Sequence, residues 1–140
     1  MNVDRTLSII IGIFLIIGFI GIAYISSTPY EVDNFTEFYL LGPDGTAGNY
    51  PTNLTTGETG KLTVGTVNHE HSNTSYLVKI TKNNEILKEE YFTLENKQIK
   101  NMPFEFNAGA EGQYSIKFDL YKLPDTKNVY RSLFILVNVR

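Results

Sequence analysis

The sequence contains no cysteine and no tryptophan, and each absence removes a class of structure. Without cysteine the chain forms no disulfide, no thiolate metal site and no cysteine nucleophile. The same two absences exclude the cysteine–tryptophan–cysteine core of antibody domains. An extracellular location is still compatible with this composition, provided that packing alone holds the domain together. Nine tyrosines and nine phenylalanines supply material for such packing.

Basic clusters and catalytic motifs are also missing. The net charge is −3, and the charged residues are interspersed without a basic stripe, so nucleic acid is not an expected partner. The sequence has no glycine-rich phosphate loop, no nucleophile elbow and no zincin motif. Glu89 and Glu90 are adjacent, so a strand would direct them to opposite faces and not into a glycosidase pair. We therefore predict no catalytic residues, no cofactor and a protein that is not an enzyme.

The two histidines lie close together in His69-Glu70-His71. In a strand both imidazoles would point to one side, about 7 Å apart, where they could share a metal ion. A stable zinc site needs further ligands, and the sequence has no second histidine or cysteine cluster. We therefore expect a solvated strand end and no metal site.

Residues 7–25, from Leu7 through Ile25, form a run of nineteen positions without a charge. As a helix this run spans roughly 28 Å, about the thickness of a membrane's hydrocarbon core. It exceeds the usual signal-peptide apolar region of roughly 7–15 residues, which favours a retained anchor over a cleaved signal peptide. The predicted organisation is a cytoplasmic flank (1–6), a transmembrane helix or signal anchor (7–27) that contacts lipid through Leu7 to Ile25, a stalk (28–34) and an extracytoplasmic β domain (35–140).

The charges on the two sides of this run differ. Arg5 precedes it, whereas Glu31, Asp33 and Glu37 follow it and no basic residue occurs before Lys61. The positive-inside rule therefore predicts a single-pass protein of the cell membrane, with a cytoplasmic N-terminus and an external domain.

Three sequons agree with an external domain. Asn34, Asn53 and Asn73 each begin an Asn-x-Ser/Thr triplet without proline, and all three follow the apolar run. They are candidate sites for N-linked glycans, which would make the protein a glycoprotein. The alternative is that a chain rich in asparagine and threonine produces such triplets by chance.

Beyond residue 34, apolar and polar residues alternate with the period of two that is typical of half-buried strands. About seven such segments are separated by turn residues, and no helical period interrupts them. We predict an all-β, immunoglobulin-like antiparallel sandwich, with a bulge at Gly65 and a charged edge strand at Lys88, Glu89 and Glu90. The segments are 35–42, 61–68, 76–81, 86–94, 102–106, 114–121 and 130–139.

Several stretches of this domain resemble an archaeal membrane-protein family. They are FTEFYLLGPDGTAGNYPTNLTTGE, VGTVNHE, IKFDLYK and YRSLFILVNV, and the likeness extends over residues 35–139. The family is catalogued only as a domain of unknown function, numbered sixteen-sixteen. Its larger members carry several membrane helices before this domain, whereas this chain has one. The resemblance implies an archaeal surface context and a sandwich-like external domain, and it implies no activity or site residues.

The first and last predicted strands are apolar on both faces. If they are neighbours in one sheet, four side chains form an outward apolar patch that binds another protein or a second copy of the chain. The alternatives are that loops cover these side chains, or that the inward and outward phases are reversed. The four residues are Phe38, Leu40, Phe134 and Leu136.

These observations favour a non-catalytic, membrane-anchored cell-surface module that mediates contacts with proteins or with the cell envelope. One alternative is an accessory subunit of a larger membrane complex. Another is a pilin-like filament subunit, since such proteins also join an apolar N-terminal helix to a β domain.

Overall fold

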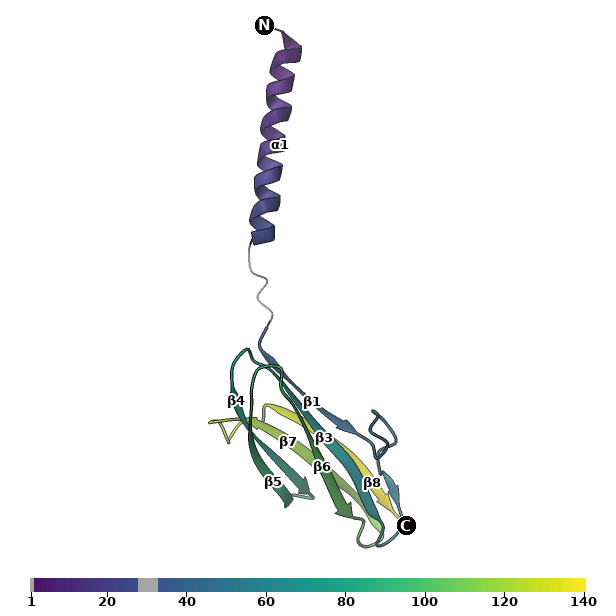
Figure 1. Ribbon diagram of the computed structural model, residues 1–140. Coiled ribbons are helices and arrows are strands. Elements are labelled where there is room, and N and C mark those ends of the chain that lie inside the picture. Colours follow the sequence, from purple (N-terminus) through teal and green to yellow (C-terminus); the bar gives the residue numbers. More distant parts are fainter. Residues whose placement is uncertain (1, 28–32) are drawn as a thin grey trace. The chain divides into compact units, whose positions relative to one another are not determined.

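The computed structural model describes residues 2–27 and 33–140, which belong to two compact units. The first contains one helix, and the second, residues 34–140, is an all-β domain (Figure 1). The predicted stalk lies mostly outside the described residues.

Helix α1, Val3–Ser27, is the predicted N-terminal apolar helix. It begins four residues before the uncharged run, with Asp4 in its first turn, where a negative charge is favoured by the helix dipole. The Ser8 and Ser27 hydroxyls donate to backbone carbonyls within the helix, so they add little polarity to its surface. None of its described side chains is buried against protein. The helix is long and apolar enough to cross a membrane, and it fits a single-pass anchor or a signal sequence.

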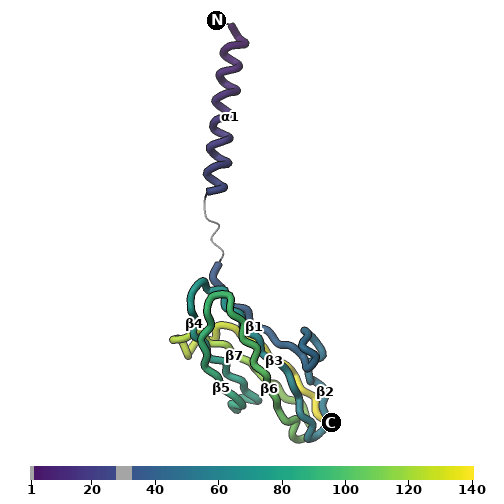
Figure 2. The backbone as a smooth tube through the Cα atoms, in the orientation of Figure 1, coloured from purple at the N-terminus to yellow at the C-terminus, as the bar shows by residue number. Residues whose placement is uncertain are grey.

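The second unit consists of two sheets packed face to face, which confirms the predicted sandwich (Figures 1 and 2). One sheet has the strand order β1-β3-β6 and the other β2-β8-β7-β4-β5. All pairings are antiparallel except that of β2 with β8. The strands are β1 (Phe35–Leu41), β2 (Asn53–Leu54), β3 (Thr59–His69), β4 (Thr74–Lys82), β5 (Glu85–Leu94), β6 (Ile99–Asn107), β7 (Gly112–Lys122) and β8 (Arg131–Val139).

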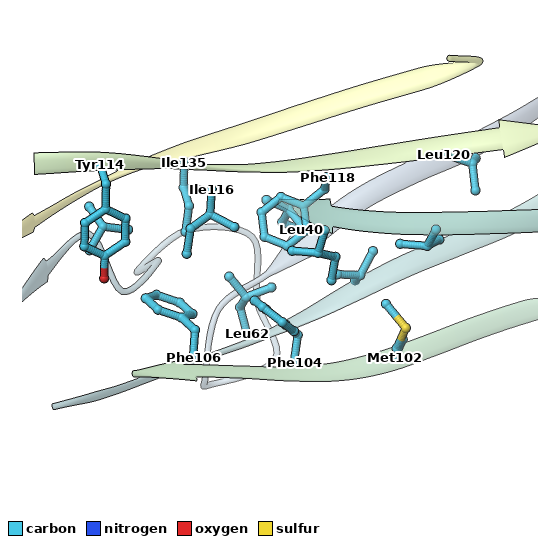
Figure 3. Packing of buried hydrophobic residues seen from close by; sticks show 14 of the residues in the cluster. Leu40, Leu62, Met102, Phe104, Phe106, Tyr114, Ile116, Phe118, Leu120 and Ile135 are labelled. Carbon is cyan, nitrogen blue, oxygen red and sulfur yellow. The ribbon is translucent and has the colours of Figure 1, made fainter. Parts of the chain in front are cut away.

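The core lies between the inner faces of the two sheets (Figure 3). Phe104 of β6 and Phe118 of β7 meet edge to face, with ring centroids 5.9 Å apart and planes at 89°. Leu62 and Ile116 are also buried in this layer. Alternate residues of strands from both sheets therefore interdigitate, as expected for a sandwich without disulfides.

The predicted bulge at Gly65 is wrong. The pairings of β3 with β1 and β6 run through Gly65 without a shift in register. Gly65 lies opposite Tyr39, and a methyl group at position 65 would collide with the tyrosine ring. The glycine therefore makes room for an aromatic side chain on the outer face. The register shift that the structure shows lies between Ile80 and Thr81, where β4 pairs with β5.

Candidate functional site

Strand β1 is an edge strand of one sheet, and β8 belongs to the other sheet, where only the two-residue β2 lies outside it, so the prediction that they are neighbours in one sheet is wrong. They nevertheless approach each other along one side of the sandwich. This side, which we call the β1/β8 flank, is where the predicted patch residues are found.

Strand β1 has the phase opposite to the one predicted. Leu40 is only 8 % exposed, and Phe38 is half-buried and packs against the core. The structure therefore removes both residues from the outward patch. The outer face of β1 carries Tyr39 instead, over Gly65. Because both faces of this strand are apolar, alternation alone did not indicate which face is buried.

Strand β8 has the predicted phase. Ile135 and Val137 are buried, whereas Phe134 and Leu136 are 66 % and 49 % exposed. Their cross-strand neighbours on β7 are Lys117 and Ser115, so polar residues border them on that side. We call Phe134 and Leu136 the β8 strip.

A groove of about 350 Å³ separates β1 from β8. Phe38 and Leu133 face inward yet remain half-buried, because neither strand covers the open side of the sandwich between them. At the end of β1, the Tyr50 hydroxyl donates to the carbonyl oxygen of Leu40 at 3.0 Å. The groove is lined by Phe38, Tyr39, Leu40, Ala47, Tyr50, Leu133, Phe134 and Ile135.

One edge of β8 pairs with β7 along its whole length, whereas the opposite edge, beside this groove, is paired only at its end. Strand β2 pairs only with Asn138 and Val139, and the Asn138 N–H donates to the Thr52 carbonyl at 2.7 Å. Because successive N–H groups of a strand alternate in direction, those of Ser132, Phe134 and Leu136 point to the same edge as that of Asn138. Within residues 2–27 and 33–140, no strand pairs with this edge from 132 to 137.

Strand β2 is short for reasons visible in the sequence before it. Pro51 has no N–H to donate, and Asn49 and Gly48 have positive φ values of 51° and 119°, which are incompatible with a regular strand. The chain therefore covers the end of the β8 edge and leaves the rest open.

A buried carboxylate joins the beginnings of β1 and β8. Glu70 is 7 % exposed, and its Oε1 accepts hydrogen bonds from Thr36 Oγ1 (2.8 Å) and from the Tyr130 hydroxyl (2.7 Å). Lys122 Nζ lies 3.5 Å from Oε2, and the Tyr76 hydroxyl shares a 2.8 Å hydrogen bond with Thr36. Burial alone would raise the pKa of Glu70, but the hydrogen bonds and the Lys122 charge together lower this pKa below its usual value. The group therefore stays ionised and holds the two strands in place.

Glu70 also borders a polar hollow of about 450 Å³. Both of its carboxylate oxygens already have partners from the fold. This end of the domain is thus polar and is held by hydrogen bonds and an ion pair of Glu70, in contrast to the apolar groove. The hollow is lined by Asn34, Glu70, Ser72, Asn73, Thr74, Ser75, Lys122 and Leu123.

The two histidines do not point to one side of a strand as predicted. Strand β3 ends at His69, and His71 has a positive φ of 64°. The His69 ring stacks on Phe35 with centroids 4.6 Å apart, and its Nε2 lies 3.3 Å from Glu37 Oε2. The His71 ring hydrogen-bonds to Asn34. Among the described residues, no group of three histidine, cysteine, aspartate or glutamate side chains is arranged to hold a metal ion.

The three sequons have different surroundings. Asn53 and Asn73 are exposed, on β2 and just before β4. Asn34 is exposed too, but Thr36, the third residue of its triplet, is buried and donates its hydroxyl to Glu70. Glycosylation at all three sites stays a prediction, and the fold favours Asn53 and Asn73.

Sequence reasoning missed Glu70, although the residue lies inside the histidine cluster. Its partners Thr36, Lys122 and Tyr130 are 34, 52 and 60 positions away, so no local pattern connects them.

Solved structures with similar folds include parts of several other proteins. The CARDB domain of the PF1109 protein from Pyrococcus furiosus, solved in complex with di-metal ions, is 19 % identical, with a TM-score of 0.57 over 80 % of this chain and 97 % of that domain. Alpha-2-macroglobulin from Escherichia coli, from domain MG7 to the C-terminus, is 17 % identical, with a TM-score of 0.57 over 76 % of this chain and 17 % of that one. A beta-glucosidase from Listeria innocua is 13 % identical, with a TM-score of 0.51 over 79 % of this chain and 17 % of that one. At these identities the likeness shows the immunoglobulin-like fold alone.

No curated protein matches the sequence. A family model, however, matches residues 29–138, which include β1, all of β8 except Val139, and Glu70 with its hydrogen-bond partners. The chain therefore belongs to the family described as Domain of unknown function (DUF1616).

Proposed function

We propose that this protein is a membrane-anchored, non-catalytic module at the cell surface that contacts another protein through the β8 strip. The observation that carries the proposal is the exposure of Phe134 and Leu136 beside an open apolar groove. Contiguous apolar surface rimmed by polar residues is typical of contact sites. Helix α1 would hold the domain at a membrane, where a modest contact suffices because both partners share one surface.

The proposed orientation has the N-terminus in the cytoplasm and the β domain outside. The charge asymmetry around the uncharged run of α1 supports it, with Arg5 in the first turns of the helix, before this run, and only acidic charges between the helix and Lys61.

Photocrosslinking in native membranes tests the proposal. A photoreactive phenylalanine analogue replaces Phe134 in one variant and Ile86 in a control. Ile86 is 54 % exposed but lies on β5, away from the groove. We expect a discrete crosslinked product from position 134 that is lost when Leu136→Asp is added, and none from position 86. Equal products from both positions, or none from 134, would overturn the proposal.

The mass of the product also separates the related functions. A crosslinked protein with several membrane helices would make this chain an accessory subunit of a larger complex. A series of multiples of the chain's own mass would make it a filament subunit.

A further inference from the structure

The open edge of β8 offers backbone hydrogen bonds as well as side chains. The N–H and C=O groups of Ser132, Phe134 and Leu136 point along the line that β2 occupies at Asn138 and Val139. The pairing with β2 shows that this edge accepts a strand in the fold's own geometry. A segment that continues this pairing toward Ser132 would enter the open flank.

A strand at this position would also fill the groove. Side chains of a sheet alternate between its two faces, so every second residue of the added strand would point inward, toward Phe38 and Leu133. The remaining side chains would lie on the outer face beside Phe134 and Leu136. The half-buried inward residues and the exposed outward ones would thus be covered by a single occupant.

The charges of the edge indicate the composition of that occupant. From Ser132 to Val139, β8 has no charged residue, and the groove lining has none either. An inward charge on the occupant would therefore lose its solvation without gaining a partner.

We propose that the contact partner inserts an extended, uncharged segment that is apolar at alternate positions. This segment pairs directly with the β8 edge, in line with β2, from Val137 toward Ser132. This inference rests on the proposed function and specifies how that contact is made. Main-chain hydrogen bonds supply affinity in such strand addition, and the groove selects side chains.

Mapping of crosslinks tests the geometry. Photoreactive residues are placed singly at positions 132, 134 and 136 of the full chain in native membranes, and the crosslinked peptides are sequenced. Strand addition predicts that the three products fall on one partner segment, at partner residues two apart. Contacts three or four residues apart, or on separate segments, overturn strand addition and leave the proposed function standing. No product from any of the three positions overturns both.

A matched pair of variants tests the backbone bonds. Leu136→Ala removes the side chain and keeps the N–H, whereas Leu136→Pro removes both. The N–H of residue 136 lies outside the β7 ladder, so proline is compatible with the fold at this edge. We expect the crosslink yield from position 134 to fall about tenfold further with proline than with alanine. Equal yields from the two variants, at equal thermal midpoints, contradict strand addition; where the midpoints differ, the crosslink spacing decides.

Discussion

The edges of the two sheets are built differently. Strand β5 carries Lys88, Glu89 and Glu90, and Glu90 pairs with Lys100 of β6 at 3.1 Å. Strand β6 includes Pro103, which donates no hydrogen bond. Charges and proline are the usual means of preventing an edge from pairing with another chain. Strand β8 has neither from Ser132 to Val139, and Phe134 and Leu136 project from it instead.

The edges of this domain therefore differ in how well they are protected against pairing with another chain. The protected strands β5 and β6 end their sheets, whereas β8 has an available row of hydrogen-bonding groups. The difference is a property of the sequence, because the same sandwich could have carried lysine at position 136 at little cost in stability.

The largest expected difference is in amide hydrogen exchange along β8. The N–H groups of Ile135 and Val137 point into the β7 ladder, and those of Phe134 and Leu136 point away from it. We expect the first pair to exchange at least about 10³-fold more slowly than the second, measured by NMR on the full chain in detergent. Similar rates for all four would show that something covers the edge.

Truncation of side chains should show the same alternation. Ile135→Ala removes a buried side chain and should lower the free energy of unfolding by about 2–5 kcal/mol. Phe134→Ala removes an exposed one and should change this free energy by no more than about 0.5 kcal/mol. Urea unfolding followed by tyrosine fluorescence measures both. A large loss for Phe134→Ala would mean that the ring packs within the fold.

Acid should remove the contribution of Glu70 to the free energy of unfolding. The pKa of Glu70 is lower in the folded than in the unfolded chain, so its stabilising contribution is present above the unfolded value and lost as pH falls through the folded one. We expect Glu70→Gln to cost about 1.5–3 kcal/mol at pH 7, since a charged acceptor is lost. Below the folded pKa the two proteins should converge. Unfolding measured from pH 7 to pH 2 checks this, and parallel curves would contradict it.

Removing a charge from one sheet edge, or adding a charge to the other, should change self-association with little effect on the free energy of unfolding. Lys88→Leu removes a charge from β5, and Leu136→Lys adds one to β8. We expect the first variant to scatter more light on mild heating and the second to scatter less, while the free energy of unfolding changes by no more than about 0.5 kcal/mol in each. The reverse order of scattering would show that these charges do not protect the edges.

The period of two was enough to find seven of the eight strands, because each extends over several alternating residues. Strand β2 has only two residues, too few to show a period. The phase of β1 was missed since Phe38 and Tyr39 are both large, and the burial of Leu40 together with the position of Tyr39 over Gly65 shows which face is outside. The Gly65 bulge was predicted from a shift in apolar phase that the structure explains by burial of both faces of β3 there.

The candidate site was predicted only in part. The exposure of Phe134 and Leu136 follows from one strand with a clear inner face, Ile135 and Val137. The groove and the unpaired edge depend on where β1 and β2 lie in space, which alternation along the chain does not encode. The Glu70 cluster depends likewise on contacts between residues distant in sequence.

The two-residue stub of β2 sets an upper limit on what β8 can accommodate. An added partner strand can pair with β8 only from Ser132 to Val137, because Asn53 and Leu54 already pair with Asn138 and Val139. That leaves six residues, or about 20 Å of extended chain. Any recognition sequence must therefore be short, and a longer one has to bend away where Thr52 meets Asn138.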